Sequence, residues 1–170
     1  MAIVIPLKAT DDDLIRIGNE NPGYKVEREE DGTVTMSPTH TRTSSKTLEA
    51  GAQLRDYAKR VGGKAFGSDA GFAIGPGERL KCPDASWASP KTIASIPPAD
   101  LDRFWPVSPD VGIEVKSHTD NFADTVAKVE MYRERGSKYA VAINPDTRDV
   151  QERGTPPDGL VLDFDAIIDA

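Results

Sequence analysis

One segment in the second half of the chain alternates apolar residues with glycine and charged residues. The segment is PDVGIEVKSHTD, residues 109–120, in which Val111, Ile113 and Val115 alternate with Gly112, Glu114 and Lys116. Because successive side chains of a strand point to opposite faces, this pattern predicts one apolar face and one face with a carboxylate beside an ammonium. The charged face is the first candidate for a functional site.

The residues after this strand predict a crossover to a second, parallel strand. Residues 121–135 have the apolar spacing of a helix that ends at Gly136, and the apolar run 139–143 is typical of a buried strand. Strand, helix and strand in this order imply a right-handed crossover between parallel strands. The remaining expected elements are two edge strands or extensions and a final helical turn, at residues 149–153, 160–164 and 165–169.

The first half of the chain predicts two helices, a hairpin and several short strands. Three aspartates begin a helix over residues 11–20, and apolar residues recur at helical spacing over about 42–60. Asp31-Gly32 is a favoured tight-turn dipeptide between two alternating runs. The expected strands are the hairpin runs 24–29 and 33–36, a pair 64–68 and 71–75 across an Asp69-Ala70 turn, and a third segment 79–87. Residues 89–108 predict a long connection with one helical turn at 99–104.

Length and charge limit the classes of protein to which the chain can belong. At 170 residues it can bury about 70% of its unfolded surface in one core, which favours a single domain. No apolar run reaches the roughly 20 residues of a membrane span, and the N-terminal segment lacks the features of a signal peptide, so we expect a cytoplasmic protein. The lone Cys82 has no partner for an internal disulfide. The net charge of −7 opposes non-specific attraction to nucleic acid, so any such role must be local or metal-assisted.

An earlier acid, Asp84, makes Glu114 and Lys116 candidates for a catalytic site. Alone, an acid two residues before a lysine is a chance-level pattern, and a salt bridge at a wet sheet edge is its ordinary alternative. Asp84 follows Pro83 in a segment bounded by turns, and an aspartate followed by Glu-X-Lys is a residue set for metal-dependent hydrolysis. Two carboxylates, the backbone carbonyl of Val115 and waters can complete the oxygen shell that Mg²⁺ requires. Such a cation lowers the pKa of a bound water, and Lys116 would orient that water or stabilise the transition state.

These residues resemble the PD-(D/E)XK nuclease superfamily, which includes many restriction endonucleases. Further motifs, in the same order along the chain, are similar to the Uma-type family of bacterial endonucleases. They are Met36-Ser37-Pro38-Thr39, Phe66-Gly67-Ser68-Asp69-Ala70-Gly71-Phe72, Pro83-Asp84, Pro109-Asp110, Glu114-Val115-Lys116-Ser117, and Lys128 with Tyr132. The resemblance runs from about Tyr24 to the segment Leu160-Val161-Leu162-Asp163.

The resemblance implies an α/β fold with a three-layer α/β/α restriction-endonuclease-like core, a mixed sheet, and an N-terminal helix plus hairpin. All of residues 1–170 would form one domain, with the helix and hairpin at 11–36, the core at about 37–153 and a C-terminal extension at 154–170. The resemblance also implies Mg²⁺-dependent hydrolysis of DNA phosphodiester bonds, with Mn²⁺ as a substitute. Asp84 and Glu114 would be the metal ligands and Lys116 the catalytic lysine.

Two helix residues are further candidates by resemblance. Many relatives lack a lysine two residues after the glutamate, and the helix lysine that matches Lys128 can then serve instead, although this chain has both. Related nucleases also often place a helix acid, here Glu49, against the metal. Each residue has an ordinary alternative. Lys128 can pair with Asp124 four residues earlier, and Glu49 can be a solvated helix residue.

The histidines depart from the family pattern. Relatives commonly carry a histidine just before the first core helix, where this chain has Thr43 or Ser44, with His40 slightly earlier. His118 could contact a phosphate, but its position also suits an exposed loop residue.

Three functional hypotheses follow. The first is a metal-dependent endonuclease acting on DNA, for which cutting both strands with one site per chain favours a homodimer. The second is a non-catalytic nuclease-like binding or assembly domain, motivated by the acidic charge and the absence of an obvious basic groove. The third is a hydrolase for a small phosphorylated substrate.

Overall fold

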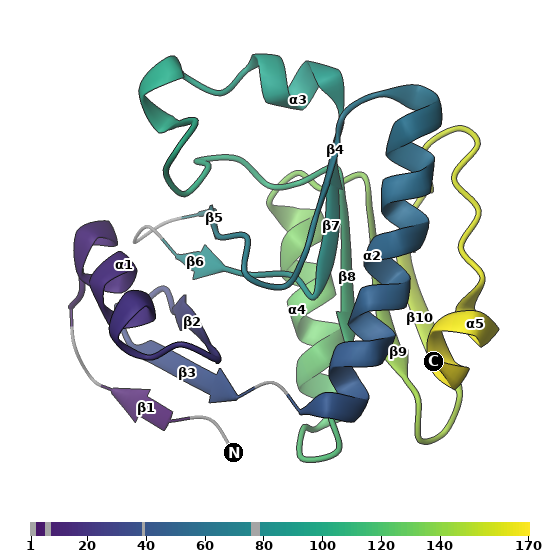
Figure 1. Ribbon diagram of the computed structural model, residues 1–170, viewed down its shortest axis with the longest axis horizontal. Coiled ribbons are helices and arrows are strands. Elements are labelled where there is room, and N and C mark those ends of the chain that lie inside the picture. The colour runs from purple at the N-terminus through teal and green to yellow at the C-terminus, as the bar shows by residue number, and fades with distance from the viewer. Residues whose placement is uncertain (1–2, 6–7, 39, 76–78) are drawn as a thin grey trace.

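Two five-stranded sheets organise the part of the chain that the computed structural model describes, residues 3–5, 8–38, 40–75 and 79–170 (Figure 1). The first sheet has the strand order β1-β3-β2-β6-β5 and the second the order β10-β9-β8-β7-β4. The elements of the N-terminal half are β1 (Ile3–Ile5), α1 (Asp11–Glu20), β2 (Tyr24–Arg28), β3 (Val34–Pro38), α2 (Thr41–Val61), β4 (Lys64–Phe66), β5 (Phe72–Ala73), β6 (Leu80–Lys81) and β7 (Ala85–Ala88). Those of the C-terminal half are α3 (Pro90–Ala94), η2 (Pro98–Asp100), β8 (Val111–Val115), α4 (Phe122–Glu134), β9 (Tyr139–Asn144), β10 (Asp149–Gly154) and α5 (Phe164–Asp169).

The second sheet is mixed, as the sequence predicts. β8 and β9 are parallel and joined by α4, whereas β10, β7 and β4 each pair antiparallel with a neighbour. The parallel register sets Ile113 opposite Val141 and Glu114 opposite Ala142. The predicted crossover unit of strand, helix and strand is therefore confirmed, and β8 lies at the centre of the sheet rather than at an edge.

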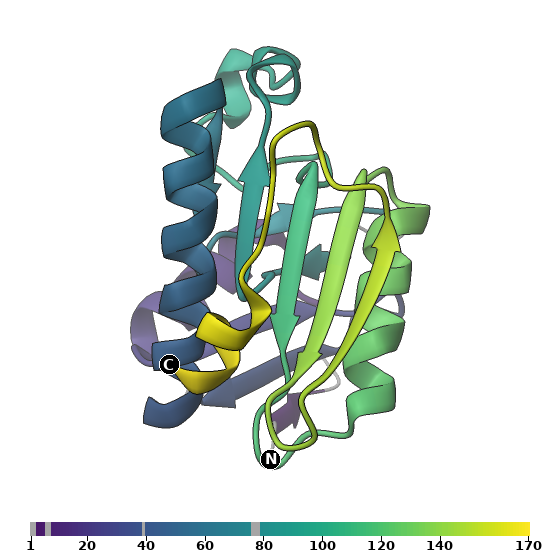
Figure 2. The ribbon, with the colours of Figure 1, turned by 90° about the vertical axis from the view of Figure 1, so that its right-hand side faces the viewer.

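Helices cover both faces of the second sheet (Figure 2). α2 and the short α5 lie on one face, and α4 lies on the other. The apolar side chains of β8 and β9 pack under α2 and α5, in a buried cluster that includes Leu54, Ile113, Val141 and Ile167. The opposite faces of β8 and β9 meet Val129 and Tyr132 of α4. This arrangement is the predicted three-layer α/β/α core.

The N-terminal helix and hairpin form the predicted unit at one side of the core. Thr10 and Asp13 form a capping box at the start of α1. β2 and β3 pair antiparallel, with Lys25 opposite Ser37 and Val26 opposite Met36. Val26 packs toward the apolar cluster of Leu14, Val34 and Leu80. Because strand side chains alternate, Lys25 and Ser37 face the other way, toward the second sheet.

The strands predicted in the middle of the chain are present, but they join different sheets and one of them is divided in two. The runs 64–68 and 71–75 do not form a hairpin, because β4 pairs with β7 in the second sheet while β5 pairs with β6 in the first. The segment 79–87 is two strands, β6 and β7, again in different sheets. Local alternation predicts that a run is extended, but not which sheet it joins. The chain crosses between the sheets at Cys82-Pro83-Asp84, where Pro83 has no backbone N–H to donate to a ladder.

The predictions for the C-terminal segment and the long connection need smaller corrections. Residues 160–164 are not a strand, since Asp163 caps α5 through a hydrogen bond from the backbone N–H of Ala166. The predicted helical turn at 99–104 lies earlier, as η2, and is preceded by α3 with Ser89 as its N-cap. Thr39 of the predicted family motif lies outside the described residues. No helix in the described ranges is long and apolar enough to cross a membrane.

Candidate active site

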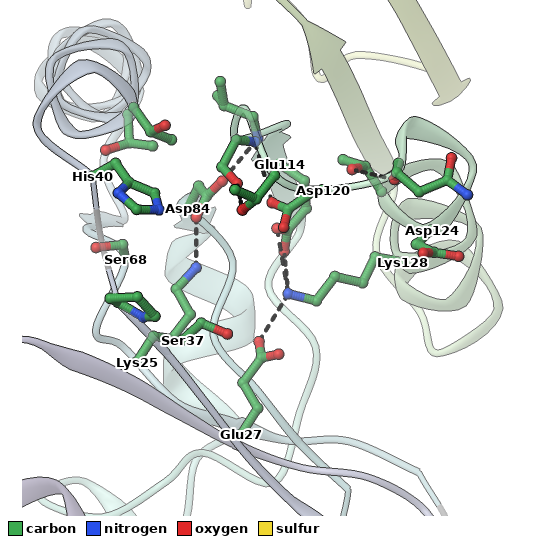
Figure 3. A pocket seen from close by; sticks show the side chains of 18 residues that line it. Lys25, Glu27, Ser37, His40, Ser68, Asp84, Glu114, Asp120, Asp124 and Lys128 are labelled. Carbon is green, nitrogen blue, oxygen red and sulfur yellow. Dashed lines mark hydrogen bonds and ion pairs between the residues drawn. The ribbon is translucent and has the colours of Figure 1, made fainter. Parts of the chain in front are cut away.

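A cavity of about 440 Å³ lies between the two sheets and collects most of the predicted site residues (Figure 3). The first sheet contributes the side chains of β2 and β3, and the second contributes the C-terminal end of β8. The first turns of α2 and α4 close the sides of the cavity. Its charged groups are Lys25, Glu27, Asp84, Glu114, Asp120, Asp124 and Lys128. The cavity is therefore mainly acidic, with two ammonium groups among the carboxylates.

Asp84 is held against β8 by the backbone. It lies at the point where the chain enters β7, and its Oδ2 accepts a hydrogen bond of 2.8 Å from the backbone N–H of Val115. In a strand the N–H and the C=O of one residue point to the same side. The Val115 carbonyl consequently points toward the side on which Asp84 lies, as a shared metal site would require.

Glu114 lies under α4 and is only 4% exposed. Its Oε1 accepts a hydrogen bond of 2.6 Å from the hydroxyl of Tyr132, and the ammonium of Lys128 lies 3.4 Å away. Gly112, two residues earlier on the same face, leaves space for the Tyr132 ring. This burial excludes the alternative of a surface salt bridge at a wet sheet edge.

Lys128 bridges two acids from different sheets. Its Nζ lies 2.9 Å from Oε1 of Glu27 on β2 and 3.4 Å from Glu114 on β8. Among the described residues these are the acids that its ammonium contacts, and the alternative pair with Asp124 does not form. Of the two interpretations of Lys128, the structure therefore places its ammonium beside Glu114 and not beside Asp124.

Lys25 makes the corresponding contact on the other side of the cavity. Its ammonium lies 2.5 Å from Oδ1 of Asp84, and both side chains are mostly buried, at 14% and 12% exposure. Burial acts to lower the pKa of Lys25, but the Asp84 and Glu114 carboxylates raise it above its ordinary value. Lys25 is therefore a permanent cation at neutral pH.

The two buried glutamates are in opposite electrostatic situations. Burial acts to raise the pKa of Glu27, but the ammonium groups of Lys128, Lys81 and Lys25 lower it to about 2. Burial also raises the pKa of Glu114, and Asp84 adds to this shift against the opposing effect of Lys128. The ionised form of Glu114 is thus incompletely compensated by the positive groups around it.

Lys116 lies apart from this cluster. Its ammonium is 2.9 Å from Oδ2 of Asp146, in the turn between β9 and β10, and also donates to the backbone carbonyl of Ser117. Among the described residues, those that line the cavity include Val115 and Ser117 but not Lys116. The structure brings Asp84, Glu114 and Lys128 together, and it directs the Lys116 side chain elsewhere.

The other candidates lie at the border of the cavity or outside it. Glu49 accepts a hydrogen bond from Gln53 and lines a neighbouring cavity of about 680 Å³, which shares Asp84 with the first. His40 lines the first cavity at the start of α2. His118 is an exposed loop residue, as its alternative interpretation states.

A family model decides how this arrangement is classified. The model, Uma2, described as "Putative restriction endonuclease", matches residues 11–160. The chain belongs to this family. The resemblance inferred from the sequence motifs is therefore confirmed, and it supports a nuclease function.

The fold of this Uma2 family member also matches a solved structure. It is that of "a putative nuclease belonging to DUF820" from Anabaena variabilis, with a TM-score of 0.65 and 15% sequence identity. The match covers 95% of this chain and 98% of that chain. At this identity it demonstrates the fold alone, which is restriction-endonuclease-like. The curated proteins contain no significant match to this chain.

The donor set of this Uma2 protein fits a hard divalent cation, the kind that restriction-endonuclease-like families generally use. Within the described ranges no three His, Cys, Asp or Glu residues are grouped as metal ligands. Mg²⁺, however, is usually bound by one or two carboxylates and keeps several waters. Asp84, Glu114 and the Val115 carbonyl supply such a set. The incomplete compensation of the Glu114 charge also favours a cation here.

Sequence reasoning missed Lys25 and Glu27. Both contact the site across long separations, 59 residues from Lys25 to Asp84 and 101 from Glu27 to Lys128. A signal was present nonetheless, because Lys25 and Glu27 lie on the face of β2 opposite Val26, as Glu114 lies on the face of β8 opposite Ile113. A Lys-X-Glu pattern on one face of a strand was an indication of a buried polar face.

Proposed function

We propose that the chain is a Mg²⁺-dependent endonuclease that hydrolyses DNA phosphodiester bonds in the cavity between its sheets. The observation that carries the proposal is the pairing of Asp84 with the backbone of Val115, the residue after Glu114, so that both carboxylates line one cavity. Membership of a family described as restriction endonucleases supports the choice of substrate.

Asp84, Glu114 and the carbonyl of Val115 would hold the cation, for which Mn²⁺ is a substitute. When bound, such a cation lowers the pKa of a water and neutralises charge that develops on the phosphate. The protein's part is to fix the ligands. Val115 orients Asp84 through its N–H, and Tyr132 orients Glu114 through its hydroxyl.

Lys128 is the ammonium that we propose to stabilise the charged transition state. It lies beside Glu114, and its pKa is raised well above the ordinary value because Glu114, Glu27 and Asp84 outweigh the effect of burial. It therefore acts as a fixed positive charge rather than as a base. The catalytic role of Lys116 stays a prediction, which would require its ammonium to leave Asp146. Glu49 stays a predicted additional acid.

One observation favours a second function. The net charge of −7 and an acidic cavity oppose binding to a polyanion, which suits a non-catalytic binding or assembly domain. A divalent cation would change this balance locally, because it adds two positive charges next to Asp84 and Glu114. If both DNA strands are cut, one site per chain favours a two-fold homodimer.

The test is a plasmid nicking and linearisation assay with Mg²⁺ or Mn²⁺, in which the wild-type protein is compared with Glu114→Ala. The proposal expects cleavage by the wild-type protein and its loss in the variant. Equal cleavage by both proteins would contradict the proposed role of Glu114 as a metal ligand of the nuclease. Binding of the cation without cleavage of any nucleic acid would instead support the non-catalytic domain.

A further inference from the structure

The ion pair between Lys25 and Asp84 occupies an oxygen that the proposed metal site needs. Oδ2 of Asp84 accepts from the backbone N–H of Val115, and Oδ1 lies 2.5 Å from the ammonium of Lys25. Each oxygen of Asp84 therefore already has a donor. A cation that binds Asp84 must either displace one of these donors or share an oxygen with it. Figure 3 shows the Lys25 ammonium directed at Asp84 from the side of the first sheet.

We propose that Lys25 is a built-in competitor of the divalent cation at Asp84 and sets the affinity of the site for that cation. This inference rests on the proposed function. Either the ammonium gives up its contact with Oδ1 when the cation binds, or it stays and repels the cation at short range. Both cases lower the affinity, and both disappear when the ammonium is removed.

The ammonium of Lys128, unlike that of Lys25, has its shortest contact with an acid that is not a proposed metal ligand. Its shorter contact, 2.9 Å, is with Glu27, which is not a proposed ligand, and its distance to Glu114 is 3.4 Å. Glu27 can keep the Lys128 ammonium in place when Glu114 turns to a cation. The short contact of Lys25 is with the ligand itself, so Lys25 is the residue whose contact is exchanged.

The attachment of Lys25 makes such an exchange possible. Its backbone is fixed in β2, where it pairs with Ser37 of β3, and both residues line the cavity. The ammonium is carried on a flexible four-carbon stem, which can swing within the cavity while the strand stays in place. Lys25 can therefore compete with the cation for Asp84 without itself being a ligand.

The test measures the dissociation constant of Mn²⁺ for the full chain by isothermal titration calorimetry. Lys25→Met should bind Mn²⁺ about tenfold more tightly than the wild-type protein, equivalent to about 1.4 kcal/mol. Lys25→Arg keeps the charge and should bind no more tightly than the wild-type protein. Unchanged or weaker binding by Lys25→Met would overturn the inference, because a merely structural lysine would weaken the site when removed.

The matched control is Lys81→Met. Lys81 lies on the neighbouring strand β6, and its substitution removes the same charge as Lys25→Met. Its ammonium, however, contacts Glu29 and lies 3.6 Å from Glu27, and neither acid is a proposed metal ligand. Tightening as large as that of Lys25→Met would show that only net charge matters, and would overturn the inference. Thermal unfolding gives a second readout, in which Mn²⁺ should raise the midpoint more for Lys25→Met than for the wild-type protein.

The failure of this inference can be distinguished from failure of the proposed function. If the wild-type protein cleaves DNA and binds Mn²⁺ but Lys25→Met binds it equally well, the inference alone fails. If neither protein binds Mn²⁺ and the wild-type protein cleaves nothing, both fail. Tighter binding by Lys25→Met, with Lys25→Arg at or below wild-type affinity, supports the inference.

Discussion

The hydroxyl of Tyr132 donates a hydrogen bond of 2.6 Å to Oε1 of Glu114, from the last turn of α4 to the central strand of the second sheet. Both side chains are almost completely buried. The ring reaches this position because Gly112 has no side chain on the same face of β8. A glycine in the strand therefore determines how a proposed metal ligand is oriented.

Gly112→Ala tests this dependence. A Cβ at position 112 would lie 3.2 Å from Cδ2 of Tyr132, so the ring must give by a few tenths of an ångström, and we expect this shift to disturb its hydrogen bond to Glu114. We expect about 1–3 kcal/mol of destabilisation from overpacking, and a loss of cleavage in the fraction that remains folded. Urea unfolding and the plasmid assay measure the two effects.

Gly51→Ala is the control for Gly112→Ala. Gly51 lies inside α2, and a Cβ there meets nothing within 4 Å. Because alanine is the better helix former, this variant should be as stable as the wild-type protein or up to about 1 kcal/mol more stable. Equal stability of the two variants would show that the close packing of Tyr132 on Gly112 has no energetic importance.

Glu27 should make stability depend on pH in acid. Its folded pKa is about 2 against an ordinary value of 4.5, so the unfolded chain binds more protons between these values. The stabilising contribution of the carboxylate is complete above about pH 4.5 and is lost as the pH falls toward 2. The difference in free energy of unfolding between the wild-type protein and Glu27→Gln should therefore shrink over this range. Urea unfolding at several pH values checks this, and a constant difference would contradict it.

Lys128 and Lys116 can be distinguished by the same substitution. Lys128→Met removes the ammonium beside Glu114 and should lower the cleavage rate about 100-fold, a usual loss for one group that stabilises transition-state charge. Lys116→Met removes a contact with Asp146, which is half exposed, and should lower the rate less than tenfold. Single-turnover rates on plasmid DNA provide the comparison. A larger loss in Lys116→Met would favour the role predicted from the sequence.

The residues of β8 show what local patterns can predict. Alternation predicts the faces of Ile113 and Glu114 because both lie inside a regular strand. The same rule fails for Lys116, which follows the last residue of β8, Val115. Beyond the end of the strand its side chain is no longer fixed by alternation, and Asp146 from another turn attracts it.

Contacts between the sheets could not be predicted in this way. Lys25 and Glu27 reach the site because the first sheet packs its polar face toward β8. This packing depends on how the strands from β4 to β7 are divided, with β5 and β6 in the first sheet and β4 and β7 in the second. Pairing of the strands 64–68 and 71–75 across the Asp69-Ala70 turn would have kept these segments together in one sheet. Asp84 was found from the sequence because its position after a turn and a proline does not depend on which sheet its strand joins.

The central claim is that Asp84 and Glu114 form a cation-dependent nuclease site. The most direct test is the rate of plasmid cleavage in saturating Mg²⁺ by Asp84→Asn, which preserves the size of the side chain and removes its charge. We predict a loss of at least about 100-fold in a variant that remains folded by circular dichroism. Cleavage by Asp84→Asn at the wild-type rate would contradict the claim.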